Sequence, residues 1–272
     1  AATTAAPYAA FLVMDADSGH VLAEKNADVS RAPASLTKMM LTLIVRERVL
    51  AGDFRMDDSI RVSGRASRMG GSQVYLKHGE VFTLGELLQA VEIASANDAC
   101  VAIAEGLLGS TDAMIALMND RARGLGMRNT HFVDVHGLPP EGGIADSVTT
   151  ARDVSTLARA LIQEFPDTLR TTSKITAPFR NGTFTLWNTN QDLLRRFAGA
   201  DGLKTGYHSA AGYNLVATAK RRDMRLLTVV LGTPSAEART DETIRLLSIA
   251  FATHQRRTVV SSGETLPDHV YV

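Results

Sequence analysis

Near the start of the chain, apolar residues fall in two short runs. These are residues 11–15 and Val21–Lys25, and the turn-forming sequence Asp17-Ser18-Gly19 separates them. Short apolar or alternating runs suit strands, and the glycine permits a tight turn, so we predict a β-hairpin. From Ser35 to Gly52 the spacing is nearly helical, which predicts a helix of about four turns. Its apolar positions are Met39, Leu43, Val45 and Val49.

The stretch from about residue 56 to 170 is mostly helical in pattern. Three polar residues stand directly before apolar periodic segments and are typical N-caps, namely Thr83, Ser110 and Thr150. The segments that they open are residues 84–93, 113–123 and 151–164. Thr150-x-x-Asp153 also has the form of a capping box. We therefore predict a helical module within these limits.

Strand-like segments return after this module, at residues 184–187, 213–219 and 226–231. A final helical pattern covers residues 237–254. Because strand patterns lie at both ends of the chain, we predict an α/β fold. Its antiparallel sheet would be built from both chain ends and flanked by helices, with the helical module inserted. We expect residues 1–254 to form the main domain, and residues 255–272 a tail that could be the remnant of a β domain.

The composition is that of a globular protein. The chain has 272 residues, of which 45% are hydrophobic and 21% charged, enough to bury a full core. The formal net charge is zero, so no global field favours nucleic acid or an anionic lipid surface. No apolar run approaches the roughly 18 residues that a membrane helix needs. We expect a neutral or mixed-charge substrate, no nucleic-acid partner and no transmembrane segment in this chain.

Two further features bear on location and cofactors. Residues 1–6 are small or polar, which fits the remnant left after removal of a signal peptide and equally a plain flexible end. The seven histidines form no H-E-x-x-H pair, and Cys100 is the single cysteine. Because Cys100 lies in an apolar run, we interpret it as a small buried hydrophobe rather than a nucleophile. We predict neither a metal nor a cofactor.

Three short polar motifs stand out, in the order Ser35-Leu36-Thr37-Lys38, Ser95-Ala96-Asn97 and Lys204-Thr205-Gly206. A pattern with two fixed positions turns up by chance about once in a chain of this size, whereas a fully specified Lys-Thr-Gly turns up about once in several thousand residues. The combination is therefore far more specific than any of its parts.

The first motif can supply a nucleophile and its base. Ser35 is predicted at the start of a helix, where free backbone NH groups favour an oxyanion on an attacked carbonyl. Lys38 lies one helical turn further on, so its amine can reach the Ser35 hydroxyl. To act as a base the amine must be neutral, and we expect burial and the charge of Lys204 to lower its pKa. The alternative is a capping serine followed by a solvated lysine.

The other two motifs add polar groups. Ser95-Ala96-Asn97 interrupts a helical stretch, where Ser95 could relay a proton to a leaving amine and Asn97 could hold a substrate carbonyl. The alternative is polar satisfaction of a helix junction. Lys204-Thr205-Gly206 leads into an alternating strand, and Gly206 leaves room for an extended peptide to add alongside. The alternative for this motif is a turn on a surface hairpin.

With these motifs the chain resembles the low-molecular-mass penicillin-binding proteins of the D-alanyl-D-alanine carboxypeptidase type, serine peptidases with the penicilloyl-transferase fold. The likeness covers about residues 11–251. Besides the three motifs, it rests on residues 33–40, 95–100, 136–138, 150–153 and 201–206. It implies that residues 1–254 form a β-lactamase/transpeptidase-like catalytic domain.

The resemblance implies a serine D,D-carboxypeptidase that removes the terminal D-alanine from peptidoglycan stem pentapeptides through an acyl-enzyme. Ser35 would attack the peptide carbonyl and Lys38 would take its proton. Ser95 and Lys204 would assist transfer to the departing D-alanine, and Asn97 completes the catalytic group. β-Lactam antibiotics would be covalent inhibitors, and the expected location is extracytoplasmic, in the periplasm or the cell-wall space.

The same resemblance implies the residues that bind the substrate. The oxyanion would lie between the NH groups of Ser35 and Tyr207. Thr205 and Arg239 would recognise the terminal carboxylate of the peptide, beside Gly206. For Arg239 the support is only its spacing before Leu246-Leu247.

Two features depart from the family pattern. The link at residues 139–143 is long and unusual, and the family's C-terminal β domain is almost absent. An amphipathic membrane anchor is absent too. We expect either a truncated chain or a version of the family with essentially one module.

Three rival functions can be weighed from the sequence. A class A β-lactamase would need a Glu with an Asn four residues on, and no Glu here has one. A D,D-endopeptidase that cuts peptidoglycan cross-links would use the same residues in a differently shaped cleft. A non-catalytic peptidoglycan-binding protein would not need all five polar motif residues, which argues against it.

Overall fold

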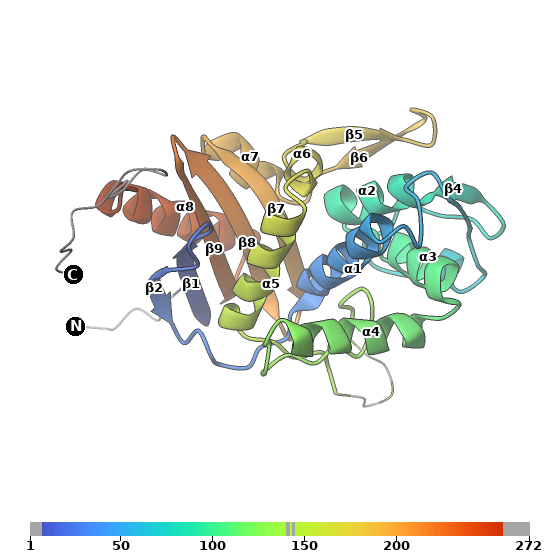
Figure 1. Cartoon of the computed structure of the whole chain (residues 1–272), viewed down its shortest axis with the longest axis horizontal. Helices are drawn as coiled ribbons and strands as arrows, with labels where there is room; N and C mark the ends of the chain where they lie inside the picture. Colours follow the sequence, from blue (N-terminus) through green and yellow to red (C-terminus); the bar gives the residue numbers. More distant parts are fainter. Residues whose placement is uncertain (1–6, 140–141, 143–144, 258–272) are drawn as a thin grey trace, which may run out of the picture.

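The computed structural model describes residues 7–139, 142 and 145–257. Its centre is a five-stranded antiparallel sheet in the order β2-β1-β9-β8-β7 (Figure 1). The strands are β1 (Ala10–Asp15), β2 (Val21–Lys25), β7 (Ala200–His208), β8 (Gly212–Arg221) and β9 (Met224–Thr233). β1 pairs with β9, from Ala10 opposite Leu231 to Asp15 opposite Leu226, so the two ends of the chain meet in one sheet.

Helices cover the sheet and form a second layer beside it (Figure 1). They are η1 (Ala34–Thr37), α1 (Lys38–Leu50), η2 (Ala66–Arg68), α2 (Leu84–Ala94), α3 (Asn97–Leu108), α4 (Thr111–Gly124), α5 (Ala151–Glu164), α6 (Thr168–Thr172), α7 (Gln191–Arg196) and α8 (Ala236–Thr253). Two short hairpins accompany them, β3 (Ser59–Arg61) with β4 (Val81–Thr83) and β5 (Thr176–Phe179) with β6 (Phe184–Trp187).

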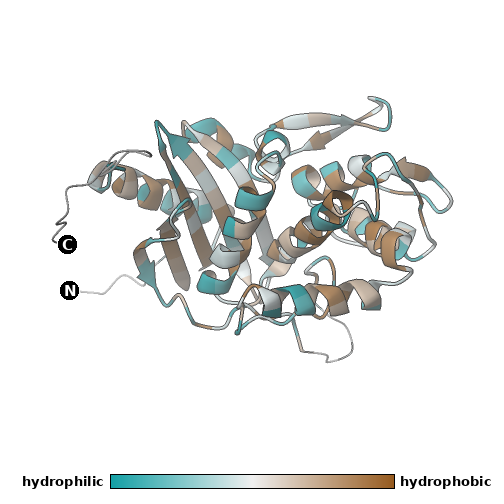
Figure 2. Cartoon of the chain, in the orientation of Figure 1, coloured by the Kyte–Doolittle hydropathy of each residue, from teal (hydrophilic) through white to brown (hydrophobic). Residues whose placement is uncertain are grey.

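The alternation of side chains along the strands divides the apolar residues between the two faces of the sheet. In β1, Phe11 and Val13 join the core shared with α7 and α8. Leu12 and Met14 point to the other face and join the larger core shared with α5 and α1. Successive side chains of a strand point to opposite faces, so a strand covered on both sides is apolar along its length. In Figure 2, β1 has the brown of hydrophobic residues, whereas the turn between β8 and β9 has the teal of hydrophilic ones.

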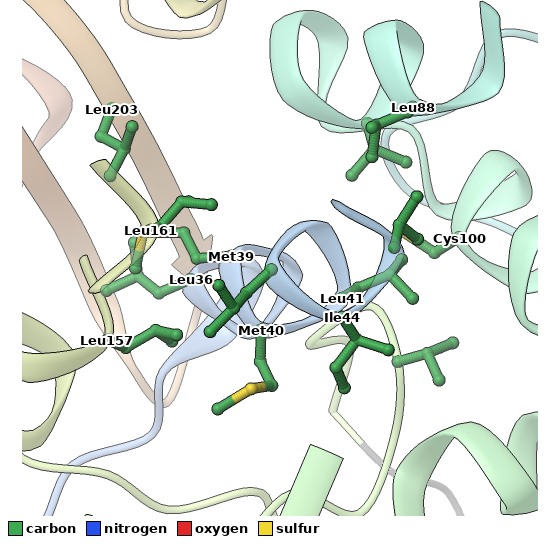
Figure 3. Packing of buried hydrophobic residues seen from close by; sticks show 14 of the residues in the cluster. Leu36, Met39, Met40, Leu41, Ile44, Leu88, Cys100, Leu157, Leu161 and Leu203 are labelled. Atoms are coloured by element: carbon green, nitrogen blue, oxygen red, sulfur yellow. The ribbon is translucent and has the colours of Figure 1, made fainter. Parts of the chain in front are cut away.

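Helix α1 is the axis of the helical layer. Its residues from Lys38 to Arg46 are buried on all sides, as is typical of a helix enclosed by others. Figure 3 shows Met39 on the side of Leu161, whereas Leu41 lies on the side of Cys100. Because α1 follows directly on η1, the 3-10 turn that contains Ser35, the packing of this helix helps to fix the position of the serine.

The predicted fold class is confirmed. The N-terminal hairpin and the helix at Ala151–Glu164 lie where the sequence placed them. Thr83, Ser110 and Thr150 each accept a hydrogen bond as N-caps of α2, α4 and α5.

Two predicted elements differ in detail. The turn at Ser35 is 3-10 before the α-helix begins, and Lys204-Thr205-Gly206 lies within a strand rather than before one. Most of the 139–143 link and residues 258–272 of the tail lie outside the described residues. The division of the chain at residue 254 stays a prediction.

Candidate active site

The backbone around Ser35 is held in a strained conformation. Ala34, the residue before it, has a left-handed φ of 50°. Gly137, with φ 82°, presses against it, and a Cβ at Gly137 would lie 1.9 Å from the Ala34 carbonyl oxygen. A non-glycine residue in this region costs about 1–3 kcal/mol and persists only where its surroundings enforce it. The loop that contains Gly137 therefore fixes the serine turn from outside.

Lys38 lies one turn after Ser35 and is fully buried. Its Nζ donates to Ser35 Oγ at 2.8 Å and to the His136 carbonyl oxygen at 2.5 Å. Ser35 Oγ itself lies 3.5 Å from that carbonyl oxygen, so its short contact is with the lysine. The amine and the hydroxyl are thus at the distance that proton transfer requires.

Burial lowers the pKa of Lys38, and the carboxylates of Asp134 and Asp98 oppose this shift. The pKa of Lys204 falls well below its usual value, because that side chain is buried and because Lys38 is a nearby cation. Burial is the main cause for both lysines, as expected for Lys38, and the charges of the two side chains oppose each other.

The second motif lies at the junction of α2 and α3. Ser95 ends α2 with a left-handed φ of 59°, and Asn97 begins α3. Ser95 Oγ accepts a hydrogen bond from Lys204 Nζ at 2.9 Å. Asn97 Nδ2 donates to the Gly70 carbonyl oxygen at 2.8 Å, while its buried Oδ1 has no partner among the residues that the structure describes. The junction therefore presents a hydroxyl to the second lysine and keeps an amide oxygen unpaired.

The third motif lies on β7, the edge strand of the sheet. A Cβ at Gly206 would lie 2.9 Å from the Pro33 carbonyl oxygen and 3.1 Å from Ser35 N. Asn214 of β8 also donates to the Pro33 carbonyl oxygen, at 3.2 Å. Only a residue without a side chain lets the strand approach the serine turn this closely.

Tyr207 and Arg239 lie at the outer end of this strand. The half-exposed Tyr207 ring stacks on Tyr213, with centroids 4.1 Å apart. The Arg239 guanidinium lies 5.9 Å from the centre of the Tyr213 ring, and its Nε has no partner within the described part of the chain. Burial lowers the pKa of Arg239, while Asp192 opposes the shift. A half-buried cation with an unused donor is suited to an anionic ligand.

The structure brings the residues of all three motifs together. Lys38 is hydrogen-bonded to Ser35, Lys204 is hydrogen-bonded to Ser95, and Gly206 lies against the serine turn. Asn97 joins them through the glycine pair 70–71, since a Cβ at Gly71 would meet both Asn97 and Leu138. Arg239 is more remote and is linked to the strand through Tyr213 and Tyr207.

Sequence reasoning missed the groups that hold these residues. The His136 carbonyl accepts from Lys38, and Asp134 Oδ1 accepts from His136 N at 2.6 Å. A backbone carbonyl leaves no chemical signature in a sequence, although the His136-Gly137-Leu138 stretch was noticed for its family likeness. Cys100 is buried as predicted, and burial raises its pKa to about 12, so it is a neutral thiol.

The profile of the peptidase S11 family, D-alanyl-D-alanine carboxypeptidase, matches residues 2–235. The chain belongs to this family. D-alanyl-D-alanine carboxypeptidase DacF of Bacillus subtilis is 36% identical to it over 258 residues, which cover 94% of this chain and 65% of that relative. DacA of Escherichia coli K12 is 38% identical over 247 residues, which cover 89% of this chain and 60% of that relative. This S11 chain thus spans less than two thirds of either relative.

Solved structures of the family have the same fold. The carboxypeptidase DacD of Francisella tularensis matches with a TM-score of 0.85 and 33% identity, covering 92% of this chain and 72% of that one. Penicillin-binding protein D2 of Listeria monocytogenes, in its ampicillin-bound form, matches with a TM-score of 0.82 and 33% identity. That match covers 92% of this chain and the whole of the other.

The hydropathy of the helices bears on the membrane. Within residues 7–139, 142 and 145–257, no single helix is long and apolar enough to cross a bilayer. The helices α3 and α4, bent by 89° at their junction, meet the length and composition limits only when taken as a pair.

Proposed function

We propose that this chain is a serine D,D-carboxypeptidase that removes the terminal D-alanine from peptidoglycan stem pentapeptides. The observation that carries the proposal is the 2.8 Å contact between Ser35 Oγ and Nζ of the fully buried Lys38. Burial favours the neutral amine of Lys38, which can accept a proton. A second lysine, Lys204, is hydrogen-bonded to Ser95. Family membership supports the same substrate.

Acylation begins when Ser35 Oγ attacks the carbonyl carbon of the D-Ala-D-Ala peptide bond. The hydroxyl proton passes to Lys38 Nζ as the new C–O bond forms. The electron pair of the carbonyl moves onto oxygen, where the NH groups of Ser35 and Tyr207 stabilise the negative charge. Ser35 lies in the first turn of a helix, where backbone NH groups have no intrahelical acceptor.

The tetrahedral intermediate then collapses. The C–N bond breaks, and Ser95, hydrogen-bonded to Lys204, passes a proton to the departing amine. The product is an ester on Ser35, which water hydrolyses to free the shortened peptide and restore the hydroxyl. Asn97 holds a substrate carbonyl, and Thr205 and Arg239 bind the terminal carboxylate beside Gly206.

β-Lactams are covalent inhibitors in this proposal. Their strained ring places an acyl carbonyl and a carboxylate where the peptide has its own, so Ser35 opens the ring and the leaving group stays attached to the ester. The ampicillin-bound relative supports this reading. The substrate is peptidoglycan, so the site of action is extracytoplasmic. In this proposal residues 1–254 form the catalytic domain.

Release of D-alanine tests the proposal. The purified chain should free D-alanine from a peptide that ends in D-Ala-D-Ala, and labelled penicillin should remain on the denatured protein. The Ser35→Ala variant should do neither. Equal labelling of the Ser35→Ala variant would remove Ser35 as the nucleophile. Cleavage of cross-linked muropeptides into monomers, without release of D-alanine from monomeric pentapeptides, would instead indicate an endopeptidase.

A further inference from the structure

A threonine outside the three motifs contacts the proposed carboxylate site. Thr189 lies in the segment between β6 and α7. The hydroxyl of Thr205 donates to Thr189 Oγ1 at 2.7 Å. Thr205 is buried, with 6% of its surface exposed, whereas Thr189 is exposed. The hydrogen bond thus joins a buried residue of β7 to an exposed residue outside the strand.

Two buried asparagines hold Thr189 in this place. The side chain of Asn188 donates to the carbonyl oxygens of Thr172 and Lys174, at 2.9 and 2.8 Å. The side chain of Asn190 donates to the Gly202 carbonyl oxygen at 3.2 Å, and its backbone NH donates to Asn188 Oδ1. Buried amides with several bonds fix a backbone strongly. A simple surface loop would not need such bracing around an exposed residue.

The contact limits what Thr205 can do alone. A threonine hydroxyl has one proton to donate and can also accept. Here the Thr205 hydroxyl donates its proton to the hydrogen bond with Thr189. A carboxylate only accepts hydrogen bonds, so its arrival requires the Thr205 proton to turn toward it. The Thr205 oxygen then needs a donor, and the Thr189 hydroxyl lies at the right distance to reverse its role.

We propose that Thr189 is a positioning residue of the carboxylate subsite, which donates to Thr205 Oγ1 when Thr205 donates to the substrate carboxylate. The inference rests on the proposed function, since it assigns the ligand of Thr205 from it. It adds a residue from outside the three motifs to the recognition of the terminal carboxylate.

Benzylpenicillin and its methyl ester test this role, because the two differ only in the carboxylate. The second-order rate of acylation is measured for the full chain and for Thr189→Val, which keeps the shape of the side chain but removes the hydroxyl. We expect Thr189→Val to lower the rate with benzylpenicillin about tenfold and the rate with the ester less than about twofold. Thr189→Ser should stay within about twofold of the unchanged chain with both compounds. Thr185→Val, at an exposed threonine on the preceding strand β6, is the matched control.

A double-mutant cycle makes the test specific to the pair. Thr189→Val should have no further effect in the background of Thr205→Val if the two hydroxyls act together. An equal loss with acid and ester, or full additivity with Thr205→Val, would overturn the inference. If the unchanged chain releases no D-alanine, only the proposed carboxypeptidase activity is overturned. The rates of acylation by benzylpenicillin and its ester would still measure the role of Thr189.

Discussion

Lys38 and Lys204 expose 0% and 4% of their surfaces, which is rare for lysine. Removing an ammonium group from water penalises its charged form, so the lysines have lowered pKa values. Two cations this close in a buried site also repel each other. The proposed hydrolase needs a neutral amine, and burial favours that form at a cost in stability.

The pH dependence of acylation follows from the lowered pKa of Lys38. The rate of acylation should rise with pH as Lys38 loses its proton, with a midpoint below the ordinary value of 10.5. Labelled penicillin at a series of pH values gives this profile. Lys38→Arg should be inactive throughout, since arginine cannot be deprotonated in proteins. A midpoint at or above 10.5 would contradict the assignment of Lys38 as the base.

The burial of Lys38 also predicts that removing its charge will abolish activity but increase stability. A lysine whose pKa is lowered on folding binds fewer protons in the folded state, so its cost is fully present below the folded pKa and fades as pH rises toward the unfolded value. Lys38→Met should therefore abolish acylation yet raise the free energy of unfolding at neutral pH by about 1–2 kcal/mol. Lys220→Met, at an exposed site, should change it by less than about 0.5 kcal/mol. A lower denaturation midpoint for Lys38→Met would show that its hydrogen bonds outweigh the burial cost.

At the scale of elements, the site is made by loops that press on the start of α1. Gly137→Ala would add a Cβ 1.9 Å from the Ala34 carbonyl oxygen, at a φ of 82°. We expect a loss of about 3 kcal/mol in unfolding free energy and about a hundredfold loss in acylation rate, because the serine turn must shift.

Gly182→Ala is a control that separates the two effects of Gly137→Ala, the clash with Ala34 and the strain of a side chain at positive φ. Gly182 has a φ of 84° with nothing within 4 Å of a Cβ, so it carries the backbone cost alone, about 1 kcal/mol. Chemical denaturation and penicillin labelling of both variants give the comparison. Equal losses for the two would mean that contact with Ala34 is unimportant.

The long elements could be predicted from the sequence and the short ones could not. The helix Ala151–Glu164 has a cap, a clear period and a proline beyond it, so its limits are local properties. The short hairpins and the 3-10 turn at Ser35 depend on contacts with distant segments. The motif residues could be named, but Thr189, Asp134 and the His136 carbonyl act through position, which single-sequence patterns do not encode.

At the scale of the whole molecule, one buried ion pair ties the helical layer together. Arg46 of α1 contacts Glu92 of α2 at 2.9 Å and Asp167, just before α6, at 2.8 Å. The side chains of Arg46 and Glu92 are 7% and 4% exposed. Burial raises the pKa of Glu92, and Arg46 opposes that shift. The pair therefore holds α1, which begins with Lys38, against α2, which ends at Ser95.

Arg46→Met should destabilise the protein by about 3 kcal/mol, because Glu92 would remain buried without its partner. The double variant Arg46→Met with Glu92→Leu should recover most of this loss, since no unpaired charge remains. Denaturant unfolding of the three proteins measures both steps. A double variant as unstable as the single one would show that packing, not charge, decides the effect.

The pairing of β1 with β9 has a consequence for biosynthesis. A ribosome delivers β1 first and β9 only about 200 residues later, so β1 waits with one edge open while the helices are made. Gly206 reaches Ser35 only once β7 lies in that sheet. A nascent chain that does not yet contain β7 therefore lacks the contact between Gly206 and the serine turn, and the proposed activity can appear only after β7 has been made.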